Sequence, residues 1–171
     1  MTTIIVQGSA RGDGNTTAVA QALGEQLAAP IIDLLQHRVY PFTYAHDYPA
    51  DDEFIPLLRR CLAYDRMILA SPVYWYTMSA QLKVFVDRLT DLLTTHKPLG
   101  RQLRGKLLGV LSCANDAEVN PSFYDAFRLT AEYLGMEYAG EWHGWVAPPT
   151  QEQPTAIPSV SRRAPPGGGL G

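Results

Sequence analysis

Short apolar runs alternate along the chain with longer segments whose apolar positions recur every three or four residues. The short runs have the length of strands, and the longer segments have the spacing of amphipathic helices. The expected strands are residues 3–7, 30–35, 66–70, 106–113 and 137–146, and the expected helices are residues 15–28, 51–62, 79–93 and 120–134. The predicted order of elements is therefore βαβαβαβαβ.

Polar and conformationally special residues mark the ends of these helices. Ser79 and Asn120 stand where a side chain can accept a hydrogen bond from the first helical turn, and Pro121 suits that turn. Gly135 follows the last apolar position of its segment and is a typical helix stop. These signals support the helix limits that the periodicity gives.

Strands joined through helices form a parallel sheet with helices on both faces. Because such crossovers are right-handed, the expected fold is a doubly wound α/β domain with five parallel strands. Ligands bind such sheets outside the carboxyl ends of the strands. The loops after the first, third and fourth strands are therefore the candidate site.

Length and composition narrow the class of protein. The 171 residues fit one domain, with 46 % hydrophobic and 18 % charged residues and a net charge of −3. This balance argues against a nucleic acid or an anionic membrane as the main partner. The chain shows neither a signal-peptide pattern nor about 20 consecutive apolar residues, so we expect a cytoplasmic protein without a membrane span.

The residues that bind metals are dispersed. Cys61 and Cys113 show no CxxC spacing, and the four histidines show no ligand spacing. We therefore expect reduced cysteines and no metal site. Ser, His and Asp residues occur without the context of a catalytic triad, such as GxSxG, so no side chain is assigned as catalytic.

The loop after the first strand reads GSARGDGNTT, residues 8–17. A glycine-rich turn that enters a helix binds anions through backbone N–H groups and the helix dipole. Its spacing matches neither GxGxxG nor the P-loop, which leaves a single phosphate as the expected ligand. The candidate phosphate ligands are Ser9, Arg11, Asn15, Thr16 and Thr17. The alternative is an ordinary turn whose polar side chains only cap the helix.

The loop after the third strand begins SPVYWYTMS at Ser71 and places three consecutive aromatic residues at the ligand edge of the sheet. Rings in this position can flank a flat conjugated ligand, whose heteroatoms bond the backbone. The alternative is that Tyr74, Trp75 and Tyr76 pack beneath a loop.

Together, GSARGDGNT and SPVYW followed by SAQLKVFVDR closely resemble the NAD(P)H-dependent FMN reductase family, which has the flavodoxin-like fold. The resemblance covers about residues 2–146 and implies strand order 2-1-3-4-5, with residues 1–146 as the FMN-binding domain. It implies FMN phosphate at the five residues named above, and the flavin ring against Pro72, Val73, Tyr74 and Trp75. The loop after the fourth strand lacks the glycines often found in relatives. Asn115 and Asp116 could still bond the flavin edge, and Ala114 and Asn115 are carried over as cofactor residues.

The resemblance implies an oxidoreductase in which NAD(P)H reduces FMN, and the flavin then reduces a small acceptor such as a quinone, a flavin, an azo or nitro compound or a metal ion. The alternative is an FMN electron carrier that docks to proteins, and a third possibility is a binding module without flavin. Cys113 beside the flavin is either a reactive thiol or, as we expect, a buried inert one.

Residues 147–171 are rich in proline and glycine and cannot form the fifth helix that relatives usually have. We expect this tail to be disordered and the fifth helix to be missing. The sheet face left uncovered, together with the common dimers of the family, leads us to expect a homo-oligomer, a dimer or larger.

Overall fold

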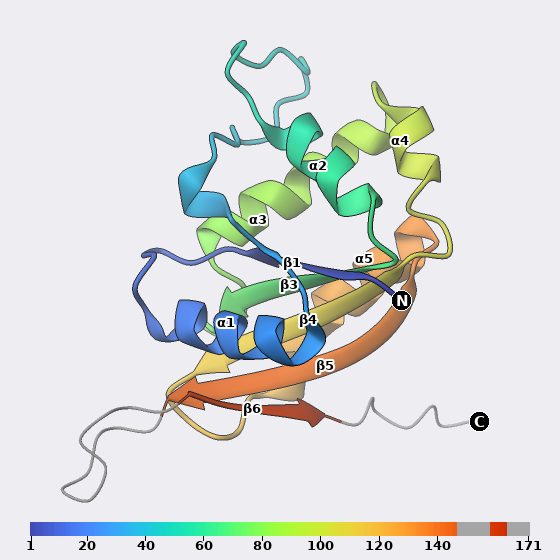
Figure 1. Ribbon diagram of the computed structural model, residues 1–171. Coiled ribbons are helices and arrows are strands. Elements are labelled where there is room, and N and C mark those ends of the chain that lie inside the picture. Colours follow the sequence, from blue (N-terminus) through green and yellow to red (C-terminus); the bar gives the residue numbers. More distant parts are fainter. Residues whose placement is uncertain (147–157, 164–171) are drawn as a thin grey trace, which may run out of the picture.

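The computed structural model describes residues 1–146 and 158–163, and its centre is a twisted six-stranded sheet (Figure 1). The spatial order is β2-β1-β3-β4-β5-β6. The first five strands are parallel, and β6 is antiparallel to β5. The strands are β1 (Thr3–Gln7), β2 (Ile31–Asp33), β3 (Arg66–Pro72), β4 (Leu107–Ala114), β5 (Glu137–Val146) and β6 (Pro158–Arg163). The predicted order 2-1-3-4-5 is confirmed.

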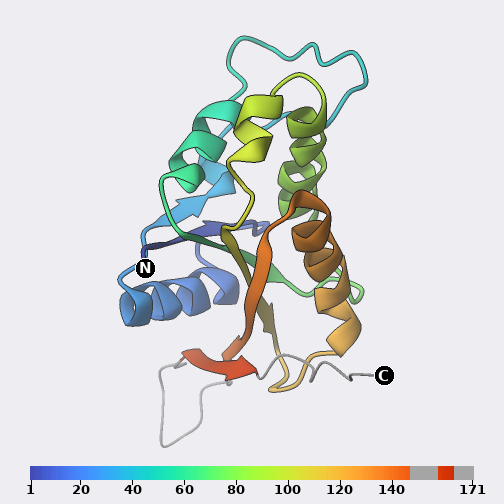
Figure 2. The same ribbon diagram turned by 90° about the vertical axis from the view of Figure 1, so that its right-hand side faces the viewer.

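Helices cover both faces of the sheet, as in a doubly wound fold (Figure 2). One face carries α1 (Asn15–Leu27), whereas α2 (Phe54–Leu62), α3 (Ala80–Asp87) and α5 (Asp125–Leu134) lie on the other. The remaining helical segments are short: η1 (Leu34–Gln36), η2 (Arg88–Leu93), α4 (Lys97–Arg101) and η3 (Pro121–Tyr124).

Two hydrophobic clusters follow from this layering. The larger one lies between the sheet and the α2, α3 and α5 helices, and its rings include Phe54 and Phe85 in edge-to-face contact at 5.4 Å. The smaller one lies beneath α1 and includes Ile5, Val19 and Leu23. Alternating strand residues supply the two sides, which is why the strands read as nearly continuous apolar runs.

Local interactions move some element boundaries away from the sequence expectation. The β2 strand ends at Asp33, because the Asp33 carboxylate accepts the Leu35 N–H and starts η1. The helix that begins at Ser79 is α-helical only to Asp87 and continues as the tighter η2. The short α4 was not predicted, and neither was the 3₁₀ start of the helix after Asn120.

The prediction of a tail without regular structure is wrong for Pro158–Arg163, which forms β6, and the sheet has six strands rather than five. Residues 147–157 and 164–171 lie outside the described residues. The β6 strand begins at Pro158, has no other proline up to Arg163, and pairs with β5. No helix follows β5 within the described ranges, 1–146 and 158–163.

An indole ring covers part of the sheet face that was expected to remain bare. Trp142 is 5 % exposed, and a Cβ at Gly109 would lie 2.7 Å from its ring. The guanidinium carbons of Arg66 and Arg162 lie 5.3 and 5.7 Å from the centre of this ring. Trp142 and β6 therefore replace some of the cover that a fifth helix would give.

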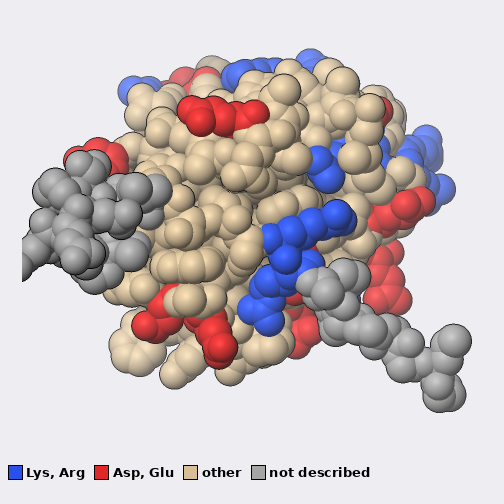
Figure 3. Space-filling model, turned by 60° about the horizontal axis from the view of Figure 1, so that its bottom comes forward, with Lys and Arg blue, Asp and Glu red and all other residues tan. Residues whose placement is uncertain are grey.

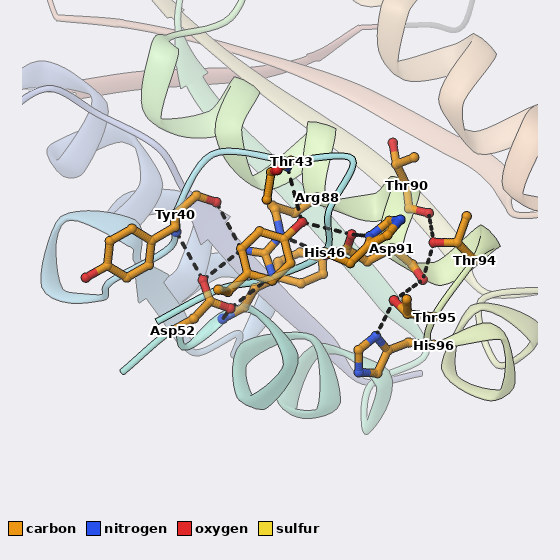
Figure 4. A network of polar contacts seen from close by, with 12 residues as sticks. Tyr40, Thr43, His46, Asp52, Arg88, Thr90, Asp91, Thr94, Thr95 and His96 are labelled. Atoms are coloured by element: carbon orange, nitrogen blue, oxygen red, sulfur yellow. Dashed lines mark hydrogen bonds and ion pairs between the residues drawn. The ribbon is translucent and has the colours of Figure 1, made fainter. Parts of the chain in front are cut away.

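A buried arginine ties the 37–53 segment to η2 (Figure 4). The Arg88 guanidinium donates to both Asp52 carboxylate oxygens at 2.7 and 3.0 Å and to Asp91 Oδ2 at 2.8 Å, and it lies 3.5 Å from the centre of the Tyr48 ring. His46 and Tyr48 also contact the Asp91 carboxylate, at 2.9 and 3.0 Å. Two carboxylates thus compensate one fully buried cation, which fixes the long connection between β2 and α2.

Charge on the underside of the molecule is mixed. Figure 3 shows Lys and Arg side chains in a short band with acidic side chains on either side of it. In the part of the chain that the structure describes, no helix is both long and apolar enough to cross a bilayer.

Candidate functional site

The β1–α1 loop is held against α3 by two contacts that only a glycine and a small hydroxyl residue allow. A Cβ at Gly8 would lie 2.6 Å from the Leu82 Cβ, so this position excludes any side chain. The Ser79 hydroxyl donates to the Gly8 carbonyl at 2.8 Å and accepts the Leu82 N–H at 3.2 Å. One serine therefore caps α3 and also fixes the start of the loop.

The N-terminus of α1 has no side-chain cap that would occupy its free backbone N–H groups. Its N-cap is Gly14, no side chain caps it, and its first turn contains no acidic residue. Arg11 folds over this glycine, because a Cβ there would lie 2.9 Å from the Arg11 Nε. Backbone N–H groups, the positive end of the helix dipole and one guanidinium thus point to the same place, which suits an anion.

The loop after β3 forms a tight hairpin turn that presents aromatic rings to solvent. Tyr74 and Thr77 exchange both backbone hydrogen bonds, at 2.9 and 3.0 Å. The two central residues have positive φ, 48° at Trp75 and 67° at Tyr76, as a type I′ turn requires. Trp75 is 93 % exposed and Tyr76 is 67 % exposed, so burial within this chain does not compensate the unfavourable backbone.

Short hydrogen bonds join this loop to its neighbours. The Ser79 N–H donates to the Ser71 hydroxyl at 2.9 Å, which closes the segment between them. The Val73 N–H donates to the Cys113 carbonyl at 2.8 Å and so links the ends of β3 and β4. The three ligand-edge loops are therefore mutually attached.

These loops enclose a cavity of about 540 Å³, a size typical of small-molecule and cofactor sites. Most of the predicted cofactor residues line it: Arg11, Asn15, Thr16, Pro72, Val73, Tyr74, Trp75, Ala114 and Asn115. Residues from three separate strand ends, including residues more than 100 positions apart, thus meet at one place.

Two predicted phosphate ligands do not line this cavity. Ser9 is buried, and its hydroxyl lies 3.5 Å from the Arg11 N–H. The Thr17 hydroxyl accepts a hydrogen bond from Gln7 Nε2 at 2.8 Å. Both residues therefore support the loop from within.

Six further residues line the cavity: Tyr76, Cys113, Asp116, Glu118, Val119 and Asn120. The sequence reasoning had placed the first three beside the expected flavin, and it did not expect the last three at the site. Tyr76 continues the aromatic run, which was a usable signal. The 118–120 segment has no motif of its own, and only its place after β4 could have indicated it.

Cys113 is a buried thiol in the cavity wall. Burial raises its pKa, and a hydrogen bond with Thr16 lowers it by less. The thiol is therefore protonated at neutral pH, which fits an unreactive cysteine.

The residues present fit FMN. The open N-terminus of α1, with Arg11 and Asn15, suits a phosphate group, and the apolar Pro72 and Val73 with the aromatic turn suit a flat ring. The two ends of the cavity thus differ in chemistry in the way that the two ends of FMN do. Within the described residues, no group of three or more His, Cys, Asp or Glu side chains could hold a metal ion.

Comparison with known proteins agrees with this geometry. The family model for NADPH-dependent FMN reductase matches residues 1–142. The chain belongs to this family. Its members are flavoenzymes that use FMN and a nicotinamide cosubstrate, which favours an enzyme over an electron carrier.

Individual relatives agree with the family assignment. YwqN of Bacillus subtilis (strain 168), named as an NAD(P)H-dependent FMN-containing oxidoreductase, is 25 % identical over 148 residues, which are 80 % of each chain. The solved Trp repressor binding protein from Bacillus subtilis has a TM-score of 0.65 at 22 % identity over 84 % of this chain and 83 % of its own. This likeness shows the flavodoxin-like fold.

A further relative differs in its cofactors. The iron–sulfur flavoprotein MJ1083 of Methanocaldococcus jannaschii is 32 % identical over 123 residues, which are 66 % of this chain and 61 % of that protein. An iron–sulfur cluster usually needs four cysteine ligands. The 171 residues contain only Cys61 and Cys113, so this segment cannot supply such a set.

Proposed function

We propose that the cavity between the loops after β1, β3 and β4 binds FMN and that the protein passes electrons from NAD(P)H through this flavin to a small molecule. The convergence of an open helix N-terminus and an aromatic turn on one cavity carries the proposal. The chemistry that bound FMN would supply is acceptance of a hydride from the nicotinamide and transfer of the electrons to the second substrate.

The chain's own residues hold and orient the cofactor. Arg11, Asn15 and the α1 N-terminus bind the phosphate through charge-assisted hydrogen bonds, and Thr16 adds a hydroxyl at the cavity wall. Pro72 and Val73 form the rigid wall beside the ring, because β3 continues to Pro72 and the Val73 N–H is bonded to β4.

The exposed aromatic rings serve the second half of the reaction. Trp75 and Tyr76 lie at the mouth of the cavity, where a flat substrate has to approach the flavin. Since the nicotinamide and the acceptor use the same face in turn, we expect ping-pong kinetics. A small aromatic acceptor, such as a quinone, suits this mouth better than a protein partner does.

A direct experiment tests this function. Purified protein reconstituted with FMN should show the oxidised-flavin absorption bands and should consume NAD(P)H steadily with a quinone acceptor. Parallel initial-rate lines in double-reciprocal plots would support the shared site. Flavin that is bound but not reduced by either nicotinamide would contradict the reductase and favour an electron carrier.

We also propose that the chain self-associates. An apolar groove of about 290 Å³ lies between α3–η2 and α5, where Leu93, Leu129 and Tyr133 are 40, 55 and 76 % exposed. Such a surface is a typical interface. Light scattering on a sizing column tests the proposal, and a single monomer peak at micromolar concentration would contradict it.

A further inference from the structure

A chain of buried polar side chains runs beneath the β4 loop, defined here as residues 114–119. His143 Nε2 lies 2.8 Å from the Asp116 carbonyl oxygen, and His143 Nδ1 lies 2.8 Å from the Ser112 hydroxyl. Ser112 in turn lies 2.6 Å from the Tyr124 hydroxyl. All three side chains are at most 2 % exposed, and none of them lines the cavity, whereas Asp116 does.

Hydrogen-bond chemistry gives this chain one direction when the imidazole is neutral. A carbonyl oxygen only accepts, so His143 Nε2 must carry the proton and donate to Asp116. Nδ1 is then an acceptor, and Ser112 must donate to it. The Ser112 oxygen can therefore accept a hydrogen bond from the Tyr124 hydroxyl, so every donor between Tyr124 and Asp116 has an acceptor.

The β4 loop has few other attachments. Within the described part of the chain, the backbone of residues 115–119 makes no hydrogen bond with other backbone groups. Its carbonyls are instead held by two side chains: His143 binds Asp116, and Arg163 Nη1 donates to the Val119 carbonyl at 3.1 Å. The position of the loop thus depends on side chains from β5 and β6.

We propose that His143 is a positioning residue for the ring end of the cofactor site, an inference that rests on the proposed FMN site. It fixes the Asp116 carbonyl and thereby places the Asn115–Asp116 segment at the cavity wall. Ser112 and Tyr124 hold the imidazole in the tautomer that does so. The phosphate end is built on β1 and α1 and does not depend on the hydrogen bonds among Tyr124, Ser112 and His143.

Cofactor-free protein tests the positioning role without any flavin. Long-range ¹H–¹⁵N spectra should show His143 with its proton on Nε2. In His143→Phe, which cannot donate, ¹⁵N relaxation should show increased backbone motion confined to residues 114–119. A proton on Nδ1 in the wild type, or unchanged loop motion in this variant, would overturn the proposal.

Ligand titration tests which end of the site responds. His143→Phe should weaken riboflavin about tenfold, the scale of one lost hydrogen bond, and leave the affinity for inorganic phosphate unchanged. In His143→Gln the side-chain amide can donate near the Nε2 position, so affinity should return to within about threefold of wild type. His37→Phe, which makes the same substitution at a histidine that contacts Glu53 and does not line the cavity, is the matched control.

Each result decides a different point. Equal losses for riboflavin and phosphate, or a glutamine variant as weak as the phenylalanine variant, would show general structural damage and overturn the positioning role. Wild-type protein that binds no flavin would instead refute the proposed function, and the relaxation data would still decide the role of His143. Should His143→Phe not fold, the wild-type tautomer and the glutamine variant decide it.

Discussion

Replacing Trp75-Tyr76 by Asn-Gly should make the protein more stable and a poorer enzyme. Both residues have positive φ, a conformation that costs an L-residue other than glycine about 1–2 kcal/mol. Asn-Gly is the preferred pair for a type I′ turn. Since Trp75 and Tyr76 are 93 % and 67 % exposed, little packing is lost on replacement.

The expected gain follows from two opposing terms. Relief of the left-handed backbone at both positions gives about 2–3 kcal/mol. The greater freedom of glycine in the unfolded chain returns about 1 kcal/mol of it. The net gain of about 1–2 kcal/mol corresponds to a rise of roughly 2–8 °C in Tm for a chain of this size.

Calorimetry and stopped-flow reduction by NAD(P)H provide the assay. The double variant should melt higher, bind FMN about tenfold more weakly and reduce a quinone more slowly, because the aromatic mouth is gone. Tyr44→Asn is the control: this tyrosine is 91 % exposed but has no left-handed backbone, so the change should raise neither Tm nor KM. An unchanged or lower Tm in the double variant would refute the strain argument. A higher Tm with wild-type flavin affinity and turnover would show that the two rings have no role at the site.

Three further predictions concern the phosphate end, the buried ion cluster and the helical groove. Asn15→Ala with Thr16→Val should weaken FMN about 100-fold or more with the fold intact, because two bonds to a charged phosphate are lost, and fluorescence titration measures this. Asp91→Asn should cost about 3–5 kcal/mol at pH 7 in urea unfolding, since it leaves Arg88 less compensated. Burial alone would raise the Asp91 pKa, but hydrogen bonds from Arg88 and its neighbours lower it, so the stabilisation by Asp91 is complete above about pH 4 and is lost below. The difference in unfolding free energy between wild type and variant should therefore narrow as the pH falls below about 4. A difference that stays constant with pH would contradict a lowered Asp91 pKa. Leu129→Glu should shift any dimer toward monomer in light scattering without changing the flavin affinity of the folded chain.

The fold could be predicted because its signal is repeated. The central strands β1, β3 and β4 are buried on both faces and each main helix has an apolar stripe, so the alternation is visible without knowledge of the tertiary contacts. The tail shows what composition alone cannot predict: residues 147–171 are rich in proline and glycine, yet Pro158–Arg163 pairs with β5. A strand that is stabilised mainly by an existing edge has little signal of its own.

In the candidate site, too, some features could be predicted from local sequence patterns and others could not. The glycine-rich loop after β1 and the aromatic turn after β3 were predictable as cavity walls because glycine spacing and consecutive rings are local patterns. Ser9 and Thr17 show what the local pattern omits: their direction depends on Gln7 and on the packing of the loop, so two plausible ligands turn inward. The Arg88 cluster and the His143 chain join residues that are distant in sequence, and no spacing rule could have paired them.

Different elements form the two ends of the cavity. We therefore expect one end to determine mainly the affinity for the cofactor and the other to determine mainly the turnover rate. At the proposed phosphate end, the groups available to the ligand are backbone N–H groups and residues fixed by β1 and α1, and Ser79 holds Gly8 against Leu82. Because these groups are already fixed, binding a ligand there costs little conformational entropy. This end can therefore supply most of the binding free energy. At the ring end, a strained turn with exposed aromatics and a loop held by His143 and Arg163 leave room for adjustment. That adjustment would suit the proposed function, in which the site holds one cofactor tightly and exchanges two flat substrates on its open face.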